Sequence, residues 1–224
     1  MLGRTSRVLA ISPHADDVEL GVGGTLLRLA KEGAEIHTML CIARDEALLS
    51  NGAVSSETRL TEFQTSMALL GSDYSLMPGY SKALADLPKA KVVAAMDACI
   101  AGFKPTVVLI PLPSFHQEHQ YIHDCAIAAC RPTKSQILPT VLSYEYPAAN
   151  WGPSAGYNPA SGGVYVNISD FFKGKLELLK AHKSQGFDRG GLVSFQGVDA
   201  LARMRGSESG CRHAELLYLL RHTL

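Results

Sequence analysis

Two short stretches of the sequence carry side chains of the kinds that bind metals and move protons. In the first, SPHADDVELGVGG at residues 12–24, His14, Asp16 and Asp17 fall within four positions, directly after the apolar run VLAI. A tight turn can aim the His14 imidazole and the Asp17 carboxylate at one point, and zinc accepts nitrogen and oxygen ligands. Asp16, pointing differently, is then available to take a proton from a water molecule. The stretch therefore predicts part of a metal site, with a third ligand elsewhere.

The glycines of this first stretch allow further interpretations. In a metal site, they would form a turn that lets the backbone fold closely around the ion and lets substrate approach. As a phosphate-binding loop, GVGG lacks the third glycine of the dinucleotide fingerprint, and two carboxylates would repel a pyrophosphate. A purely structural interpretation also stays open, in which an aspartate caps a helix and His14 is an ordinary loop residue.

The second stretch, SFHQEHQYIH at residues 114–123, follows the apolar run TVVLIPLP. It spaces His116, His119 and His123 three and four residues apart and places Glu118 between the first two. At the start of a helix, His116 and His119 can converge on one point, and titratable groups gather in functional crevices. His123 lies a full turn further along, so we expect it to pack in the interior or to contact the ligands from behind.

Both stretches follow strand-like segments in an alternating α/β pattern. Continuous apolar runs predict strands at residues 7–12, 35–43, 106–113, 140–146 and 162–169. Amphipathic patterns predict helices at residues 25–33, 56–71, 89–103, 116–131 and 169–182. This alternation predicts a Rossmann-like three-layer sandwich, a single domain with a mostly parallel central sheet. Because ligands bind at the carboxyl ends of such strands, both stretches should face the same crevice.

The composition is that of a globular protein with a sizeable core. The 224 residues are 46% hydrophobic and 19% charged. Lys plus Arg and Asp plus Glu both number 21, and this balance argues against binding to nucleic acid or to an acidic membrane. The five cysteines include no C-x-x-C pair, so we expect neither disulfides nor a thiolate metal site. Without a signal-peptide pattern or an apolar stretch of bilayer length, we expect a cytoplasmic protein.

Taken together, the two stretches resemble one family. SPHADDVELGVGG is similar to the P-H-P-D-D-[EV]-x-x-G signature of the PIG-L/LmbE-like zinc-dependent N-deacetylases, and HQEH is similar to their H-x-D-H signature. Arg59 and Glu62 stand at the family's R-x-x-E positions, and SYEY, HKSQ and HAELLYLLR resemble weaker downstream patterns. The resemblance implies one PIG-L/LmbE-like deacetylase domain over residues 1–224. Ala15 and Glu118 depart from the family's proline and aspartate.

The resemblance also implies a role for each matching residue of the two motifs. His14, Asp17 and His119 would bind one Zn²⁺ per chain, although Fe²⁺ or Co²⁺ would suit the same ligands. Asp16 would be the general base. His116 would stabilise the oxyanion and help the amine to leave.

Three further residues receive supporting roles from the resemblance. Glu118 would orient one of the two histidines of its own HQEH motif, His116 or His119. Arg59 would border the substrate pocket. Its spacing alone favours a solvated helix face or an ion pair with Glu62, three residues along the same helix. Tyr144 would form a wall of the pocket, whereas core packing is the plainer interpretation. The segment 147–163, rich in Pro, Gly and Asn, predicts a long surface loop near the site.

The function implied by the resemblance is the metal-dependent removal of an N-acetyl group from an N-acetylglucosamine-type sugar conjugate, a small-molecule substrate. Water activated by zinc would attack the amide while Asp16 accepts its proton. Two alternatives stay open: a metal-dependent phosphoesterase, which needs more bridging carboxylates, and a non-catalytic nucleotide-binding module of the same fold.

Overall fold

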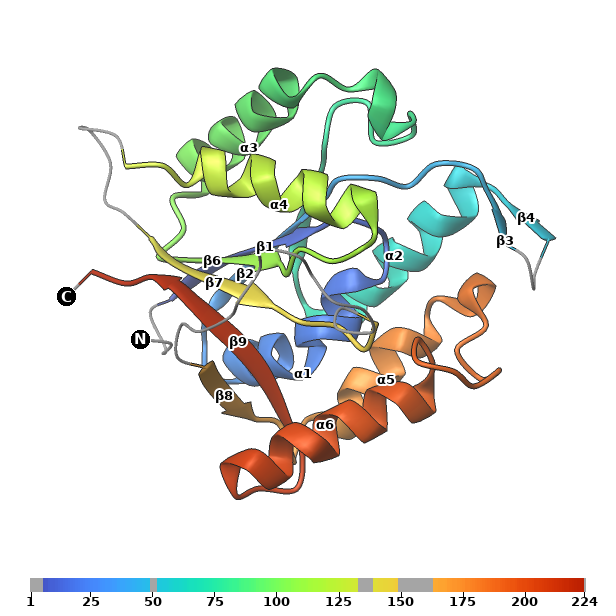
Figure 1. Cartoon of the computed structure of the whole chain (residues 1–224), viewed down its shortest axis with the longest axis vertical. Coiled ribbons are helices and arrows are strands. Elements are labelled where there is room, and N and C mark those ends of the chain that lie inside the picture. The colour runs from blue at the N-terminus through green and yellow to red at the C-terminus, as the bar shows by residue number, and fades with distance from the viewer. Residues whose placement is uncertain (1–5, 49–51, 133–138, 149–162, 224) are drawn as a thin grey trace.

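A seven-stranded sheet lies between two layers of helices in the computed structural model, which describes residues 6–48, 52–132, 139–148 and 163–223 (Figure 1). Its strands are β1 (Arg7–Ser12), β2 (Glu35–Leu40), β5 (Asp73–Leu76), β6 (Val107–Pro111), β7 (Thr140–Tyr144), β8 (Gly163–Asn167) and β9 (Ala214–Arg221). The helices are α1 (Asp17–Lys31), α2 (Ser56–Leu70), α3 (Lys89–Phe103), α4 (Gln117–Ala129), α5 (Phe172–Lys180) and α6 (Phe195–Ser209), with short 3₁₀ turns η1 (Leu84–Asp86) and η2 (Lys183–Gln185). A separate hairpin pairs β3 (Glu46–Leu48) with β4 (Gly52–Val54).

The strand order of the sheet is β5-β2-β1-β6-β7-β9-β8. The first five strands in this order are mutually parallel, whereas β9 runs antiparallel to both β7 and β8. Parallel strands need crossover helices, which bury both faces of the sheet. The structure therefore confirms the α/β fold with a mostly parallel sheet.

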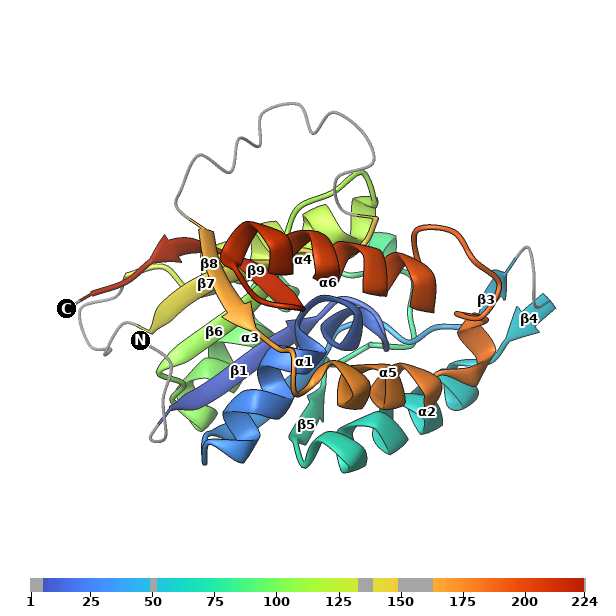
Figure 2. The same ribbon diagram turned by 90° about the horizontal axis from the view of Figure 1, so that it is seen from below.

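Two hydrophobic clusters fill the space on either side of the sheet. In β1, Val8 and Ala10 join the cluster that packs against α1, α2, α5 and α6, whereas Leu9 and Ile11 join the cluster beneath α3 and α4. This alternation follows from the two-residue period of a strand, and it explains why the run is apolar throughout. Figure 2 shows α1, α5 and α6 on the first of these faces.

The glycine-rich segment is helical, so the prediction of a turn before a helix at 25–33 is wrong. Helix α1 begins at Asp17 and includes the glycines, with one break at Val22, where φ is −135° and ψ is 15°. Glycines are needed here because neighbouring side chains lie very close to the helix backbone. A Cβ on Gly21 would come within 2.3 Å of the Tyr144 ring, and one on Gly24 within 2.7 Å of Ile168.

Gly21→Ala is expected to destabilise the fold. The added methyl group would also lie 2.8 Å from the Glu145 carbonyl oxygen, so ring and backbone must both shift. Overpacking of this kind costs about 1–3 kcal/mol of unfolding free energy. Gly102→Ala in α3 is the matched control, since a Cβ there meets no atom within 4 Å and alanine should stabilise a helix by about 0.5–1 kcal/mol. Denaturant unfolding of both variants measures the difference, and equal stabilities would contradict this account of Gly21.

Other elements of the structure differ in length from their prediction or were not predicted at all. The strand expected at 35–43 ends at Leu40, and the helix expected at 169–182 is α5. The sequence analysis did not predict β3, β4, β5, α6 or β9, because short apolar runs do not by themselves distinguish strand from helix. Of the predicted loop 147–163, residues 149–162 lie outside the described residues. Within the described part of the chain, no helix is long and apolar enough to cross a membrane.

Candidate active site

The two chemical stretches meet where neighbouring strands send their helices to opposite faces of the sheet. Strand β1 is adjacent to β6; α1, which follows β1, covers one face, and α4, which follows β6, covers the other. Such a switch point leaves a crevice at the carboxyl ends of the strands. His14 lies two residues beyond the end of β1, and His119 lies in the first turn of α4. Residues 105 positions apart are thereby brought into contact.

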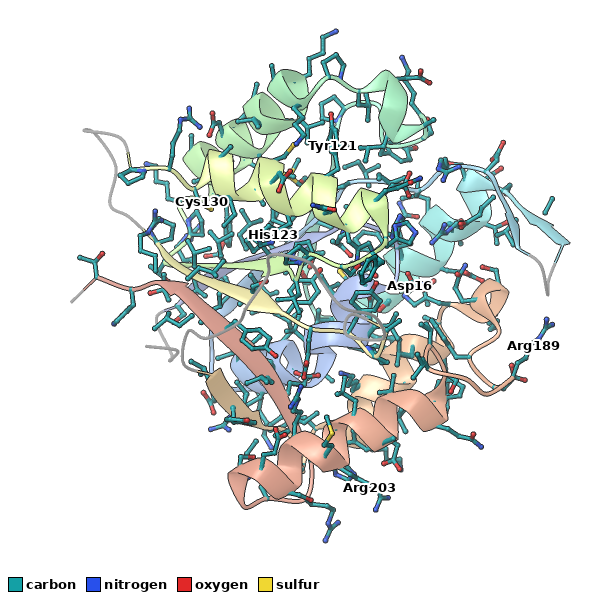
Figure 3. The ribbon with its side chains drawn as sticks, viewed as in Figure 1. Asp16, Tyr121, His123, Cys130, Arg189 and Arg203 are labelled. Carbon is teal, nitrogen blue, oxygen red and sulfur yellow. The ribbon has the colours of Figure 1, made fainter. Side chains whose placement is uncertain are left out.

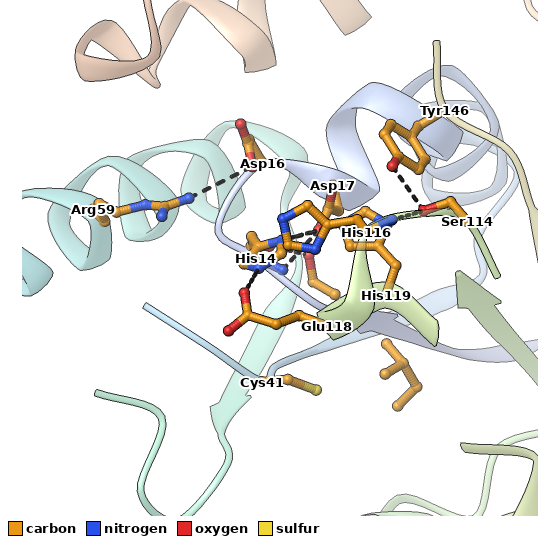
Figure 4. Close-up of polar contacts among 12 residues, drawn as sticks. His14, Asp16, Asp17, Cys41, Arg59, Ser114, His116, Glu118, His119 and Tyr146 are labelled. Carbon is orange, nitrogen blue, oxygen red and sulfur yellow. Dashed lines mark hydrogen bonds and ion pairs between the residues drawn. The ribbon is translucent and has the colours of Figure 1, made fainter. Parts of the chain in front are cut away.

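Three ligand-type atoms form a nearly equilateral triangle in this crevice (Figure 4). His14 Nδ1 lies 3.0 Å from Asp17 Oδ2 and 3.2 Å from His119 Nε2, and His119 Nε2 lies 3.1 Å from Asp17 Oδ2. A zinc ion about 2.0–2.1 Å from three tetrahedral ligands holds those ligand atoms about 3.3 Å apart. The triangle therefore has the size and the donor set that a divalent metal requires.

The electrostatics of the triangle also favour a positive charge. Burial by itself lowers the pKa of His14, but the carboxylates of Asp17 and Glu118 outweigh it and raise this pKa to about 10. Burial likewise raises the pKa of Asp17, yet His119 and His14 hold it well below its ordinary value. A site that attracts a proton so strongly offers the same stabilisation to a metal ion that displaces the proton from a ring nitrogen.

Glu118 contacts His14, which corrects the prediction that it orients a histidine of its own motif. Its Oε2 lies 2.7 Å from His14 Nε2, and Arg44 Nη2 lies 3.4 Å from its other carboxylate oxygen. Accepting a hydrogen bond from Nε2–H leaves the lone pair of His14 Nδ1 directed at the triangle. The partner could not be assigned from the sequence, because His14 is 104 positions away.

His116 lies beside the triangle, not within it. It is the N-cap residue of α4, exposed, and its backbone amide donates to Ser114 Oγ at 3.2 Å. Its ring centroid lies 4.9 Å from those of both His14 and His119, and ligand atoms of the three histidines lie within 4.8 Å of one another. Partial desolvation of its ring, together with the nearby His14 and His119, lowers the pKa of His116 and favours its neutral form.

Asp16 points away from the triangle and toward Arg59 (Figure 4). Its Oδ1 lies 3.9 Å from Arg59 Nη2, and the side chain is buried. Burial and the adjacent Asp17 carboxylate raise the pKa of Asp16, an effect that Arg59 opposes. A carboxylate with a raised pKa beside a metal-sized triangle is suited to accept a proton from water.

Arg59 borders the crevice, in contrast to the solvated face or local ion pair that its spacing alone favours. It is 4% exposed, and its Nη1 donates to Glu46 in β3. Glu62 instead binds the amide and hydroxyl of Ser184, at 2.8 and 2.7 Å. Arg59 therefore links α2 to the β3–β4 hairpin at the edge of the crevice.

Tyr144 does not line the crevice, so its prediction as a pocket wall is wrong and the packing interpretation holds. It is fully buried, and its hydroxyl donates to the Ile11 carbonyl at 2.8 Å. Two residues further along, Tyr146 occupies the pocket wall instead. Its ring lies 4.7 Å from that of His119, and its hydroxyl lies 3.0 Å from Ser114 Oγ.

A cavity of about 380 Å³ opens at the triangle. Residues from both stretches line it, together with Arg59 and with Ala148 of the segment 147–163 that was predicted to lie near the site. The lining also includes side chains that the sequence analysis missed: Leu20, Glu46, Phe115, Tyr146, Gln185 and Val193. Of these, Tyr146 is the second tyrosine of the SYEY motif and Gln185 ends the HKSQ motif, so both motifs could have indicated cavity residues. No motif indicated Glu46, because the β3–β4 hairpin brings it to the cavity.

Two further histidines, His182 and His123, are buried and have polar partners. His182, the first residue of HKSQ, places Nε2 3.0 Å from Glu19 Oε1, and both side chains are 1% exposed. Burial lowers the pKa of His182, but Glu19 and Asp16 raise it more. His123, as expected, is a packed residue: it is buried on α4, and its Nδ1 lies 2.8 Å from the Pro111 carbonyl oxygen (Figure 3).

Known proteins resemble this chain in sequence and in fold. An uncharacterized deacetylase of Escherichia coli (strain K12), YaiS, is 27% identical over 184 residues, covering 79% of this chain and 90% of its own. Diacetylchitobiose deacetylase of Thermococcus kodakarensis is 25% identical over 224 residues, covering 93% of this chain and 81% of its own. The crystal structure of A40926 pseudoaglycone deacetylase Dbv21 shares the fold, with a TM-score of 0.78, 20% identity and coverage of 98% and 99% of the two chains.

The family assignment comes from a match that spans both chemical stretches. The sequence profile of PIG-L, described as GlcNAc-PI de-N-acetylase, matches residues 9–130, more than half of the chain. This range contains residues 9–12 of β1, all of α1 and the HQEH motif, and with them the three residues of the triangle. The chain therefore belongs to the PIG-L family and is an N-deacetylase enzyme.

Proposed function

We propose that this enzyme is a metal-dependent hydrolase that removes the N-acetyl group from an N-acetylglucosamine-type sugar conjugate. The observation that carries the proposal is the triangle of His14 Nδ1, Asp17 Oδ2 and His119 Nε2, whose edges of 3.0–3.2 Å fit one divalent ion. We assign these three residues as ligands of a single Zn²⁺, with Fe²⁺ or Co²⁺ as the alternatives that the same donors accept.

The residues around the triangle supply the acid–base chemistry of amide hydrolysis. The bound metal would activate the attacking water and polarise the acyl carbonyl. Asp16 accepts the proton of that water, and its raised pKa suits a base that must later give the proton up. His116 donates a ring N–H to the carbonyl oxygen as negative charge develops there, a contribution of roughly 3–4 kcal/mol for one well-placed donor. The products are acetate and a free amine.

The shape and lining of the cavity support a sugar-sized substrate. Its volume of about 380 Å³ falls within the usual range of about 300–1,000 Å³ for small-molecule sites. Glu46, Arg59 and Gln185 offer hydrogen-bonding groups on its wall, whereas Tyr146 offers an aromatic face. The Thermococcus relative is named for a disaccharide of N-acetylated sugars, which agrees with this lining.

Glu118→Ala is expected to weaken metal binding without removing a ligand. Loss of the carboxylate releases His14 Nε2, so the tautomer that directs Nδ1 at the metal is no longer favoured. Partners of this kind are worth about 10–100-fold in metal affinity. Glu118→Gln keeps an acceptor for the same N–H and should lose less. Competition of each variant with a chelator measures the zinc dissociation constant, and an unchanged value for Glu118→Ala would remove this role.

The direct test of the proposed function uses the purified chain. Acetate release from N,N′-diacetylchitobiose and other N-acetylglucosamine conjugates should depend on added Zn²⁺, Fe²⁺ or Co²⁺ and stop with a chelator. Metal analysis should give one ion per chain, because the described residues hold one group of clustered ligand atoms. Release of phosphate from phosphate esters, with two ions per chain, would favour the phosphoesterase instead. Absence of both activities, together with nucleotide binding, would favour the non-catalytic alternative.

A further inference from the structure

Helix α1 changes direction at Val22, within the segment that carries the proposed acid–base and ligand carboxylates. The break separates a first segment, residues 17–21, from the rest of the helix. In a regular α-helix, the Gly24 amide donates to the Leu20 carbonyl. At this break, both groups have side-chain partners: Gly24 N donates to Glu215 Oε1 at 3.0 Å, and Leu20 O accepts from Lys175 Nζ at 2.8 Å.

The two side chains at the break are themselves an ion pair. Lys175 comes from α5 and Glu215 from β9; their Nζ and Oε1 atoms lie 2.6 Å apart, and both side chains are 3% exposed. Glu215 Oε2 also accepts from the Thr25 amide at 2.7 Å. The ammonium thus lies at the carboxyl end of one helical segment and the carboxylate at the amino end of the next, which matches both helix dipoles. The pair connects the two segments across the break.

The direction of the first segment decides where the site carboxylates point. Asp16 and Asp17 stand at its start, and the Leu20 amide donates to the Asp16 carbonyl at 3.0 Å. Leu20 therefore ties the ion pair, through its own carbonyl, to the turn that holds both aspartates. A shift of about 1 Å at reacting groups can cost about 100-fold in rate.

We propose that the buried Lys175–Glu215 pair is a positioning element of the active site: it maintains the break in α1 and thereby aims Asp16 and Asp17. The inference rests on the proposed function, which gives these aspartates their roles. A pair retained for stability alone would behave differently: its removal would lower stability, but Zn²⁺ affinity and kcat would stay at the values of a control that loses another buried ion pair.

The double variant K175M/E215L separates positioning from stability. It is expected to fold but to unfold at a lower temperature than wild type, because the Gly24 and Thr25 amides and the Leu20 carbonyl lose their buried partners. It should also bind Zn²⁺ at least about tenfold more weakly and lose kcat with little change in KM. Amide hydrogen exchange at Gly24 and Thr25 should be faster than in the wild-type enzyme, a readout that needs no metal. A Zn²⁺ affinity and kcat within twofold of wild type would overturn the proposal.

Two further variants keep the test decisive if the double variant unfolds. Glu215→Asp retains the charge but shortens the side chain by about one C–C bond of 1.5 Å, so it should fold and still weaken Zn²⁺ binding; wild-type affinity would overturn the inference. R205M/E145L removes another ion pair, with Arg205 Nε and Nη2 at 2.5 and 2.8 Å from Glu145. This control should keep wild-type Zn²⁺ affinity, and an equal loss there would attribute the effect to general destabilisation.

The wild-type chain distinguishes failure of this inference from failure of the proposed function. If wild type binds no divalent metal and releases no acetate, the proposed function fails, and hydrogen exchange alone still reports whether the pair maintains the break. If wild type binds Zn²⁺ and releases acetate, but K175M/E215L and Glu215→Asp do so equally well, only the positioning role fails.

Discussion

Asp16→Asn is expected to lower kcat by about 10²–10⁴-fold, the usual contribution of a general base. The asparagine side chain has nearly the same shape and can still face Arg59, but it cannot accept the proton of the attacking water. Zinc binding should persist, because the Asp16 carboxylate points away from the triangle formed by His14, Asp17 and His119. Acetate release under saturating substrate, with metal content measured on the same sample, tests both halves of this expectation.

The control for Asp16→Asn is Asp188→Asn, which makes the same chemical change at an exposed position. It should leave kcat and metal content unchanged. If Asp16→Asn keeps more than about a tenth of the wild-type kcat with a full complement of metal, a loss below the range for a general base, then Asp16 is not the base. If it loses metal instead, Asp16 belongs to the ligand set.

His119→Ala is expected to abolish metal binding at micromolar zinc and, with it, all measurable acetate release. The variant removes one corner of the triangle, and the two remaining atoms, His14 Nδ1 and Asp17 Oδ2, leave a catalytic zinc short of the three protein ligands it requires. We expect the zinc dissociation constant to rise by more than about 100-fold, beyond the 10–100-fold typical of residues that only support a ligand. Equilibrium dialysis with metal analysis measures this dissociation constant directly.

Alanine variants of the two neighbouring histidines, His123 within α4 and His116 at its N-cap, sharpen the His119 result. His123→Ala removes another buried histidine of α4, one turn along, and should cost about 1–3 kcal/mol of stability through the unpaired Pro111 carbonyl while keeping the metal. His116→Ala should keep the metal and lose kcat. Should His116→Ala lose the metal while Asp17→Ala retains it, the ligand set would be the three clustered histidines instead.

Much of the fold was predictable because its central strands are buried on both faces. Runs such as VLAI in β1 and VVLI in β6 have no polar position, and amphipathic helices between them leave few alternatives to a parallel sheet. The carboxyl-terminal part was harder. β9 is apolar along most of its length but antiparallel, and its direction follows from pairing with β7 and β8, not from its own residues.

The glycines of α1 show a limit of local interpretation. Gly21, Gly23 and Gly24 suggested a turn, because glycine is unfavourable in helices and common in loops. In the structure they are helical, since the Tyr144 ring and Ile168 leave no room for a Cβ at Gly21 and Gly24. The selecting contact lies more than a hundred residues away, so no window of sequence around the glycines contains it.

The sequence by itself determined which residues could do the chemistry. The spacing of His14 and Asp17 lets one turn bring both to a single point, and the two motifs together indicated the deacetylase family. Only the tertiary structure decided their partners: His14 for Glu118, Glu46 for Arg59, and Tyr146 in place of Tyr144 at the wall. The reason is physical. Local spacing decides which side chains a single turn can bring together. The adjacency of β1 and β6 decides which side chains from two turns far apart in the sequence can meet.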